Sequence, residues 1–142
     1  METNINQGVK IPVFHQIRFD VSGNIITDSK EYTEIFWPIF DHEEYFAFSM
    51  PDYSMEPELH QNDIIIAKHT KKINSDGGLY IVLIGPNNAA VRSIQKEKNG
   101  ILIIGYNFSI HGSHFYTTDE LQKLPVNIIG LVVEIRRRVR EK

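Results

Sequence analysis

The chain is a succession of short runs of aliphatic, β-branched and aromatic residues, separated by residues that favour turns. Runs of this length and composition are typical of strands, and closely spaced turn signals are typical of all-β domains. We therefore predict an all-β organisation without internal repeats. The predicted strands are Val13 to Phe19, Tyr45 to Phe48, Asp63 to Lys68, Leu79 to Ile84, Ala89 to Ile94, Ile101 to Ile104 and Asn127 to Arg136.

Local turn chemistry predicts two hairpins and one helix. Gly85-Pro86-Asn87-Asn88 separates two strands with residues that tolerate a positive φ or preset a turn, and Asn99-Gly100 closes the next hairpin. Thr117 followed three residues later by Glu120 makes a capping box, which predicts a short helix from Asp119 to Lys123.

The last predicted strand shows the alternation of a half-buried strand. Its two faces carry Leu131, Val133 and Ile135 on one side and Val132, Glu134 and Arg136 on the other. The aromatic-rich segment Ile35 to Phe40 is interpreted as a buried connector. We expect most of the aromatic cluster in the core, although part of it could form a self-association surface, since aromatic residues are enriched at interface centres. The cluster comprises Phe36, Trp37, Phe40, Tyr45, Phe46 and Phe48.

Length and charge limit the class of protein. At 142 residues the chain has the length of one domain, and the absence of cysteine excludes disulfides and thiolate chemistry. The 15 basic and 18 acidic side chains give a net charge of −3, which argues against a wholly basic nucleic-acid-binding surface. No apolar stretch approaches the roughly 18 residues that span a bilayer, and the polar N-terminus does not resemble a signal peptide. We expect a cytoplasmic protein with no membrane contact.

Ser54 is the first candidate for chemistry. It lies in Phe46 to Pro57, which runs from a predicted strand into a turn, and a hydroxyl at such a strand end could act as a nucleophile. Serine and proline are also common in ordinary loops. The segment by itself therefore leaves both interpretations open.

The order of several segments resembles the C-terminal domain of LexA and of the phage CI-type repressors. The segments are Ser54-Met55-Glu56-Pro57, Asp63-Ile64-Ile65-Ile66, Asp76-Gly77-Gly78-Leu79-Tyr80-Ile81-Val82, Val91-Arg92-Ser93-Ile94, Gly105-Tyr106-Asn107 and Ile129-Gly130-Leu131-Val132. The resemblance implies a mostly β, compact domain of twisted antiparallel sheets with at most one or two short helices. It assigns residues 11–142 to this domain and residues 1–10 to the end of a linker.

The resemblance also implies roles for two residues. Ser54 matches the nucleophile that attacks a peptide bond of its own chain, whereas Arg92 stands where the family has its base lysine. A buried lysine can lose its proton and accept one from serine, but a guanidinium keeps its proton and offers only donors. We therefore interpret Ser54 as a vestigial nucleophile and Arg92 as an inactive replacement of the base.

The cleavage site that the resemblance implies is also degenerate. Alignment of Ile11 to Ile17 with the family's strand before the cleavage loop places Phe19 and Asp20 at the bond, where the family has an Ala-Gly or Cys-Gly pair. A Phe-Asp pair is large and charged, and Arg18 to Asp20 continues a predicted strand. Among other lysines, Lys68 is the least improbable substitute base, because the remaining ones lie at turns or in loops, where lysines are normally solvated. The lysines compared with Lys68 in this way are Lys71, Lys72, Lys96 and Lys98.

Two further groups of residues have ordinary explanations. Metal binding would need three or four ligands at fixed geometry, and the histidines show no paired ligand motif, so we predict surface histidines and no metal site. These are His42, His60, His69, His111 and His114. The basic run Arg136 to Arg140 could contact nucleic acid, but we favour a solvated strand end, where charges also block aggregation.

We therefore expect the dimer-forming regulatory domain of a phage-repressor-like transcriptional regulator that does not cleave itself. A homodimer would hold two upstream helix-turn-helix domains, absent from this chain, on a two-fold operator. We predict no cofactor and no small-molecule ligand. The alternatives are a self-cleaving peptidase that uses Ser54, a signal-peptidase-like enzyme, which would need a membrane anchor, and direct nucleic-acid binding through Arg136 to Arg140.

Overall fold

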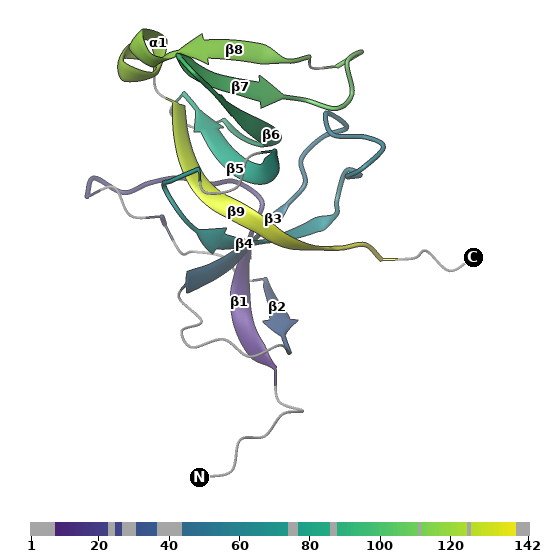
Figure 1. The fold of residues 1–142 in the computed structure, drawn as a ribbon. Coiled ribbons are helices and arrows are strands. Elements are labelled where there is room, and N and C mark those ends of the chain that lie inside the picture. Colours follow the sequence, from purple (N-terminus) through teal and green to yellow (C-terminus); the bar gives the residue numbers. More distant parts are fainter. Residues whose placement is uncertain are drawn as a thin grey trace.

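The computed structural model describes residues 8–22, 25–26, 31–36, 44–73, 77–85, 88–110, 112–124 and 126–138. These residues form nine strands and one short helix (Figure 1), which confirms the mostly β fold. The elements are β1 (Val9–Phe14), β2 (Tyr32–Ile35), β3 (Tyr45–Ser49), β4 (Ile64–His69), β5 (Gly78–Ile84), β6 (Ala89–Glu97), β7 (Gly100–Ile104), β8 (His114–Thr117), α1 (Thr118–Lys123) and β9 (Val126–Arg136).

All the described strands lie in one sheet, in the order β2-β1-β3-β4-β9-β5-β6-β7-β8. The C-terminal strand β9 is central, because it pairs with β4 on one side and with β5 on the other. In Figure 1, β9 runs as a long yellow strand from the end that carries α1 toward the C-terminus, across the middle of the molecule. It therefore joins the N-terminal half of the sheet to the hairpins of β5 to β8.

The features predicted from local turn chemistry are confirmed. β5 and β6 pair antiparallel across the loop after Gly85, and β6 and β7 pair across Asn99-Gly100. α1 has the predicted capping box, in which the Thr117 hydroxyl accepts from the Glu120 backbone N–H and the Glu120 carboxylate accepts from the Thr117 N–H. These features depend on residues close in sequence.

The sheet is mixed rather than wholly antiparallel. β1 and β3 pair parallel, with Val13 opposite Ala47 and Phe14 opposite Phe48, because β2 occupies the other edge of β1 and the chain then returns in the original direction. β1 begins at Val9, so that Val9 and Lys10, expected to end a linker, pair with β2.

β1 also ends earlier than the predicted strand Val13 to Phe19. The chain bends at His15 and Gln16, which are exposed, and buries Ile17 in the core. Two strands that the sequence did not predict, β2 and β8, occupy the two edges of the sheet. An edge strand pairs on one side only and tolerates polar and exposed residues, which weakens its apolar pattern.

Two irregularities interrupt the alternation predicted for β9. The register with β5 shifts between Ile81 and Val82, and the register with β4 shifts between Ile66 and Ala67. A bulge inserts an extra residue and breaks the period of two. As a result Ile129 and Gly130 are both buried although they are adjacent, while Val133 and Ile135 are 45% and 40% exposed.

The core confirms part of the aromatic prediction. Phe46 and Phe48 are fully buried in a cluster over the centre of the sheet, and Tyr45 is partly buried. Phe36 is 59% exposed, so its predicted burial is wrong: the chain buries Ile35 at the end of β2 and leaves the next residue outside. Trp37 and Phe40 lie outside the described residues. No helix in the described part of the chain has the length and apolarity needed to cross a bilayer.

Candidate functional site

Ser54 lies in the loop that connects β3 to β4. The loop is closed at its base, where the Met50 N–H donates to the Asp63 carbonyl and the Asn62 N–H donates to the Met50 carbonyl. A second loop holds it from outside, because the Asn107 N–H donates to the Ser54 carbonyl at 2.9 Å. Ser54 is consequently only 1% exposed.

Two side chains contact the Ser54 hydroxyl. Its Oγ donates to Oδ1 of Asp52 at 2.5 Å and accepts from Nη1 of Arg92 at 2.8 Å. The same Asp52 oxygen accepts from the Ser54 backbone N–H at 3.0 Å. The hydroxyl is therefore held between a carboxylate and a guanidinium, and its orientation is fixed by both.

Arg92 reaches this position from β6, where it pairs with Tyr80 of β5. The residue is 4% exposed, and its Nη1 also donates to the Val91 carbonyl at 2.7 Å. Its Nε is buried without a hydrogen-bond partner among the described residues. Burial lowers the pKa of Arg92, an effect that the nearby Asp52 carboxylate opposes. An arginine nevertheless stays protonated in proteins, so this side chain supplies donors and no acceptor.

Asp63 pairs with Arg137 rather than with Arg92. Arg137 donates from Nε to Oδ1 at 2.8 Å and from Nη2 to Oδ2 at 2.7 Å, a bidentate arrangement, while the His60 backbone N–H donates to Oδ2. Burial acts to raise the pKa of Asp63, but the hydrogen bonds from Arg137 and His60 hold it below its ordinary value. The carboxylate, which is 2% exposed, is thus kept ionised by its contacts.

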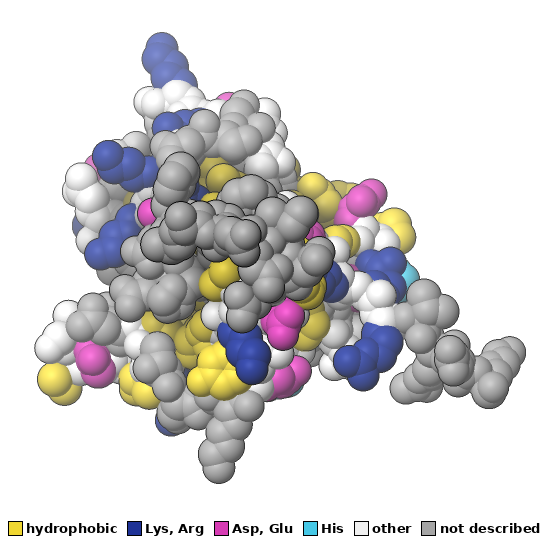
Figure 2. All heavy atoms as spheres, turned by 90° about the horizontal axis from the view of Figure 1, so that it is seen from below, with side chains coloured by type: hydrophobic (Ala, Val, Ile, Leu, Met, Phe, Trp, Pro, Cys, Tyr) yellow, Lys and Arg dark blue, Asp and Glu magenta, His cyan; other side chains and the backbone are white. Residues whose placement is uncertain are grey.

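The start of the basic run makes specific contacts with the protein, while Arg137 and Arg138 stay exposed, as expected for a solvated strand end. Arg136 donates to the Thr33 hydroxyl and the Glu34 carbonyl of β2 and pairs with Glu134, and Arg137 holds Asp63. The side chains of Val139 and Arg140 lie outside the described residues. Figure 2 shows basic and acidic side chains interspersed with apolar ones on the face seen from below.

The structure places Phe19 and Asp20 in a separate local unit. Phe19 forms an isolated bridge with Ile25 and packs partly buried on the core, and the Asp20 carboxylate accepts from the Ser22 N–H at 2.9 Å. Phe19 also lines a groove whose described lining includes neither Ser54 nor Arg92. The structure therefore brings Ser54 and Arg92 together, and it places Phe19 against different residues.

Lys68 does not have the environment of a base lysine. Its ammonium lies 3.8 Å from the Glu44 carboxylate, and about half of its side chain is exposed (51%). A lysine becomes a base when burial removes its proton, and this one remains in contact with solvent and a carboxylate.

The histidines of the described residues have separate surroundings. His69 stacks on Phe46, and His114 packs against Tyr116. No group of three or more metal-ligating side chains is found among the described residues. His42 and His111 lie outside them.

Asp52 is the residue at this site that the sequence did not identify. It stands two positions before Ser54, the spacing at which an aspartate side chain commonly accepts from a backbone N–H. That spacing is a general turn signal, so it indicated a turn rather than contact with the serine hydroxyl.

Comparison with known protein families identifies the family of the chain but does not test the roles of these residues. The family model described as Peptidase S24-like matches residues 12–133, which include Ser54, Arg92 and all nine strands at least in part. A search of the curated proteins finds no significant match. Because the family model covers most of the chain, this protein belongs to the Peptidase S24-like family.

Proposed function

We propose that this Peptidase S24-like domain is the dimer-forming regulatory domain of a phage-repressor-like transcriptional regulator, and that it does not cleave itself. The observation that carries the second part is the 2.8 Å hydrogen bond from Arg92 to the Ser54 hydroxyl. In the LexA-like mechanism a neutral amine accepts the serine proton. We assign Arg92 to the place of that amine, where its guanidinium can only donate.

The burial of the site supports the same conclusion. Acyl transfer requires a group that takes the hydroxyl proton and returns it to the leaving amine. Arg92 cannot do this, and Ser54 at 1% exposure has no open approach for a peptide bond. Phe19 bridges to Ile25 and packs against the core, so that self-cleavage between Phe19 and Asp20 would also require this segment to leave the core surface.

The competing function, an active self-cleaving peptidase, is favoured by one contact. The Ser54 Oγ donates to Asp52 at 2.5 Å, so a carboxylate is positioned to accept the proton. Carboxylates ionise well below neutral pH and are therefore weak bases for a hydroxyl. We expect this contact to orient the serine without activating it.

The experiment is a prolonged incubation at neutral and alkaline pH, followed by intact-mass measurement of the wild type, Ser54→Ala and Asp52→Asn. We expect only the intact mass in all three. A break at the bond between Phe19 and Asp20 that disappears in Ser54→Ala would overturn the proposal. Loss of that break in Asp52→Asn would identify the base. Arg92→Lys is an informative fourth variant, because it restores a side chain that can become neutral when buried.

The exposed apolar residues at the end of β9 support the proposed homodimer. Val133 and Ile135 are 45% and 40% exposed on β9. This strand ends at Arg136, which contacts Thr33 of β2, and the next residue, Arg137, binds Asp63. Burial of such side chains against a second copy would contribute favourable free energy. Sedimentation at micromolar concentration should show a dimer that Val133→Asp dissociates. Val21→Asp, at a fully exposed valine outside β9, should leave the dimer intact. A wild-type monomer would remove the basis for the dimer.

In this proposal the S24-like domain does not itself contact DNA. Arg136 and Arg137 are already engaged within the domain, which reduces the basic surface available to phosphates. We propose that a helix-turn-helix domain upstream of this chain binds the operator, and that pairing of the S24-like domains sets the spacing of the two halves. The isolated domain should accordingly show no DNA binding even at low salt.

A further inference from the structure

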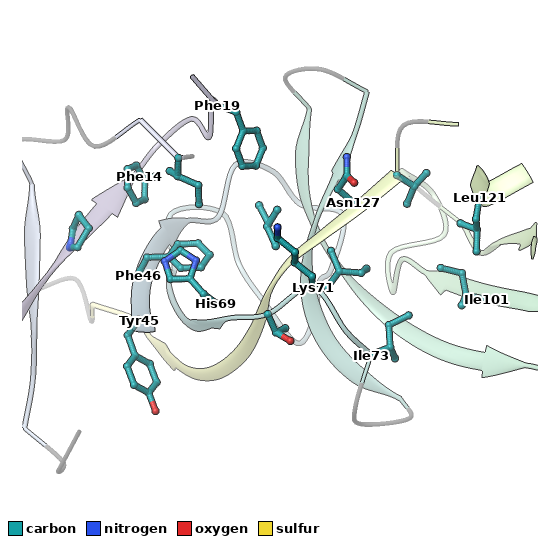
Figure 3. Close-up of a pocket in the computed structure, with 16 residues that line it drawn as sticks. Phe14, Phe19, Tyr45, Phe46, His69, Lys71, Ile73, Ile101, Leu121 and Asn127 are labelled. Atoms are coloured by element: carbon teal, nitrogen blue, oxygen red, sulfur yellow. The ribbon is translucent and has the colours of Figure 1, made fainter. Parts of the chain in front are cut away.

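A groove of about 1180 Å³ crosses the domain away from Ser54. Its walls come from both ends of the chain's sheet: Phe14 and Phe46 lie at one end, and Ile101 and Leu121 lie at the other (Figure 3). At the register shift between Ile81 and Val82, β9 carries one extra residue, Ile129, and this residue forms part of the lining. Most of the described lining is apolar, which is typical of sites that bind small organic molecules.

The polar groups of the lining gather on two adjoining segments. His69 ends β4, Thr70 and Lys71 follow it, and Asn127 lies on β9. In Figure 3 the Lys71 ammonium lies in the middle of the labelled residues, between the His69 ring and Asn127 as viewed. The apolar walls thus extend to either side of a polar centre.

The charge of this centre is positive and uncompensated by the described lining. The described lining contains two basic side chains, Lys71 and His69, and no aspartate or glutamate. Lys71 carries its positive charge whether or not His69 is protonated. His69 stacks on Phe46 with ring centroids 4.3 Å apart, and burial lowers its pKa, which favours the neutral imidazole. Asn127 is an exposed residue of the lining, so its amide can reach a ligand in the groove.

We propose that this groove binds a small apolar monocarboxylate, of the medium-chain fatty acid type. Its carboxylate would pair with the Lys71 ammonium and accept from the Asn127 amide, while its hydrocarbon part would lie on the apolar wall. One lysine matches a single negative charge. A phosphate monoester carries nearly two charges and is typically held by several donors or an arginine fork, which the described lining lacks.

This inference differs from the sequence-based expectation of no small-molecule ligand. It goes beyond the proposed function and does not depend on it, because neither Ser54 nor Arg92 lines the groove. A domain that cleaves itself, or that fails to dimerise, could still bind the ligand.

The test uses decanoate as the probe and decanol as its uncharged analogue. Both are titrated into the isotope-labelled chain at neutral pH, with backbone amide shifts as the readout. We expect saturable decanoate shifts at Lys71, Asn127 and Ile129, and decanol binding at the same amides that is weaker by about threefold to tenfold, the range of a partly exposed to a well-formed charged contact. Equal affinities for the two probes in the wild type would overturn the proposal without any variant.

Three variants locate the site. Lys71→Gln should reduce decanoate affinity to that of decanol, whereas Lys72→Gln, an exposed neighbour outside the described lining, should leave it unchanged. Asn127→Trp, at an exposed position of β9, should fill the groove and weaken both probes. Unchanged decanoate binding in Lys71→Gln, or in Asn127→Trp with a native-like spectrum, would overturn the proposal, as would saturable shifts confined to other surfaces.

Discussion

Arg92 and Ser54, which are 38 residues apart in the chain, are joined by a buried hydrogen bond of 2.8 Å from Nη1 to Oγ. Under the proposed function, the guanidinium takes the position at which a LexA-like domain would need a proton acceptor. It holds the hydroxyl without being able to deprotonate it, since all its hydrogen-bonding groups are donors. The contact therefore orients the serine hydroxyl without supplying the base that peptide cleavage requires.

The first prediction concerns the stability of this site. Arg92 is desolvated, and its Nε has no partner among the described residues. Arg92→Met keeps the length of the side chain and removes the charge. It should lower the free energy of unfolding by no more than about 1 kcal/mol, or raise it. Urea denaturation measures this. Arg137→Met is the comparison, because it leaves the buried Asp63 carboxylate without its bidentate partner and should destabilise more. The reverse ranking would contradict the prediction.

The second prediction concerns acid stability. Asp63 has a lower pKa in the folded chain than when unfolded, so the unfolded state binds more protons between the two values and stability rises with pH across that window. Its contribution is complete above the ordinary aspartate pKa of about 3.9 and is lost as the pH falls through the folded value. In denaturation series below about pH 5, Asp63→Asn should flatten the slope. An unchanged slope would show that other carboxylates cause it.

The third prediction concerns His69, which burial keeps below its ordinary pKa. The folded state disfavours the imidazolium, so its contribution to stability is complete above the unfolded pKa of about 6.5 and is lost as the pH falls below it. His69→Phe retains the stacking on Phe46 and should remove this loss. A stability profile between about pH 5 and 7 that His69→Phe leaves unchanged would contradict the prediction.

The fourth prediction concerns Gly130 of β9. A Cβ there would lie 2.9 Å from Cζ of Phe46 and 3.1 Å from Cβ of Ala67, so Gly130→Ala should overpack the core and cost about 1–3 kcal/mol. Phe46→Leu in the same chain should recover part of the loss. Gly112→Ala is the control, since its nearest contact is an ordinary 3.9 Å. Equal melting temperatures for the two single variants would contradict the prediction.

The site was only partly predictable from the sequence. Ser54 and Arg92 were identified through their segments, and the structure brings them into contact. Asp52 was missed because an aspartate two residues before a serine indicates a turn in many loops. The partners of Arg136 and Arg137 lie far away in the sequence, so the charged run alone could not distinguish bound arginines from solvated ones.

The sequence by itself determined the local elements of this protein: the β5–β6 and β6–β7 hairpins, the capped helix α1 and the mostly β character. Each depends on turn geometry or side-chain alternation within a few residues. Only the tertiary structure decided the parallel pairing of β1 with β3, the edge strands, the irregularities of β9 and the groove beside it. Those features depend on which distant strands share a ladder, and that is set by the packing of the whole core rather than by any one segment.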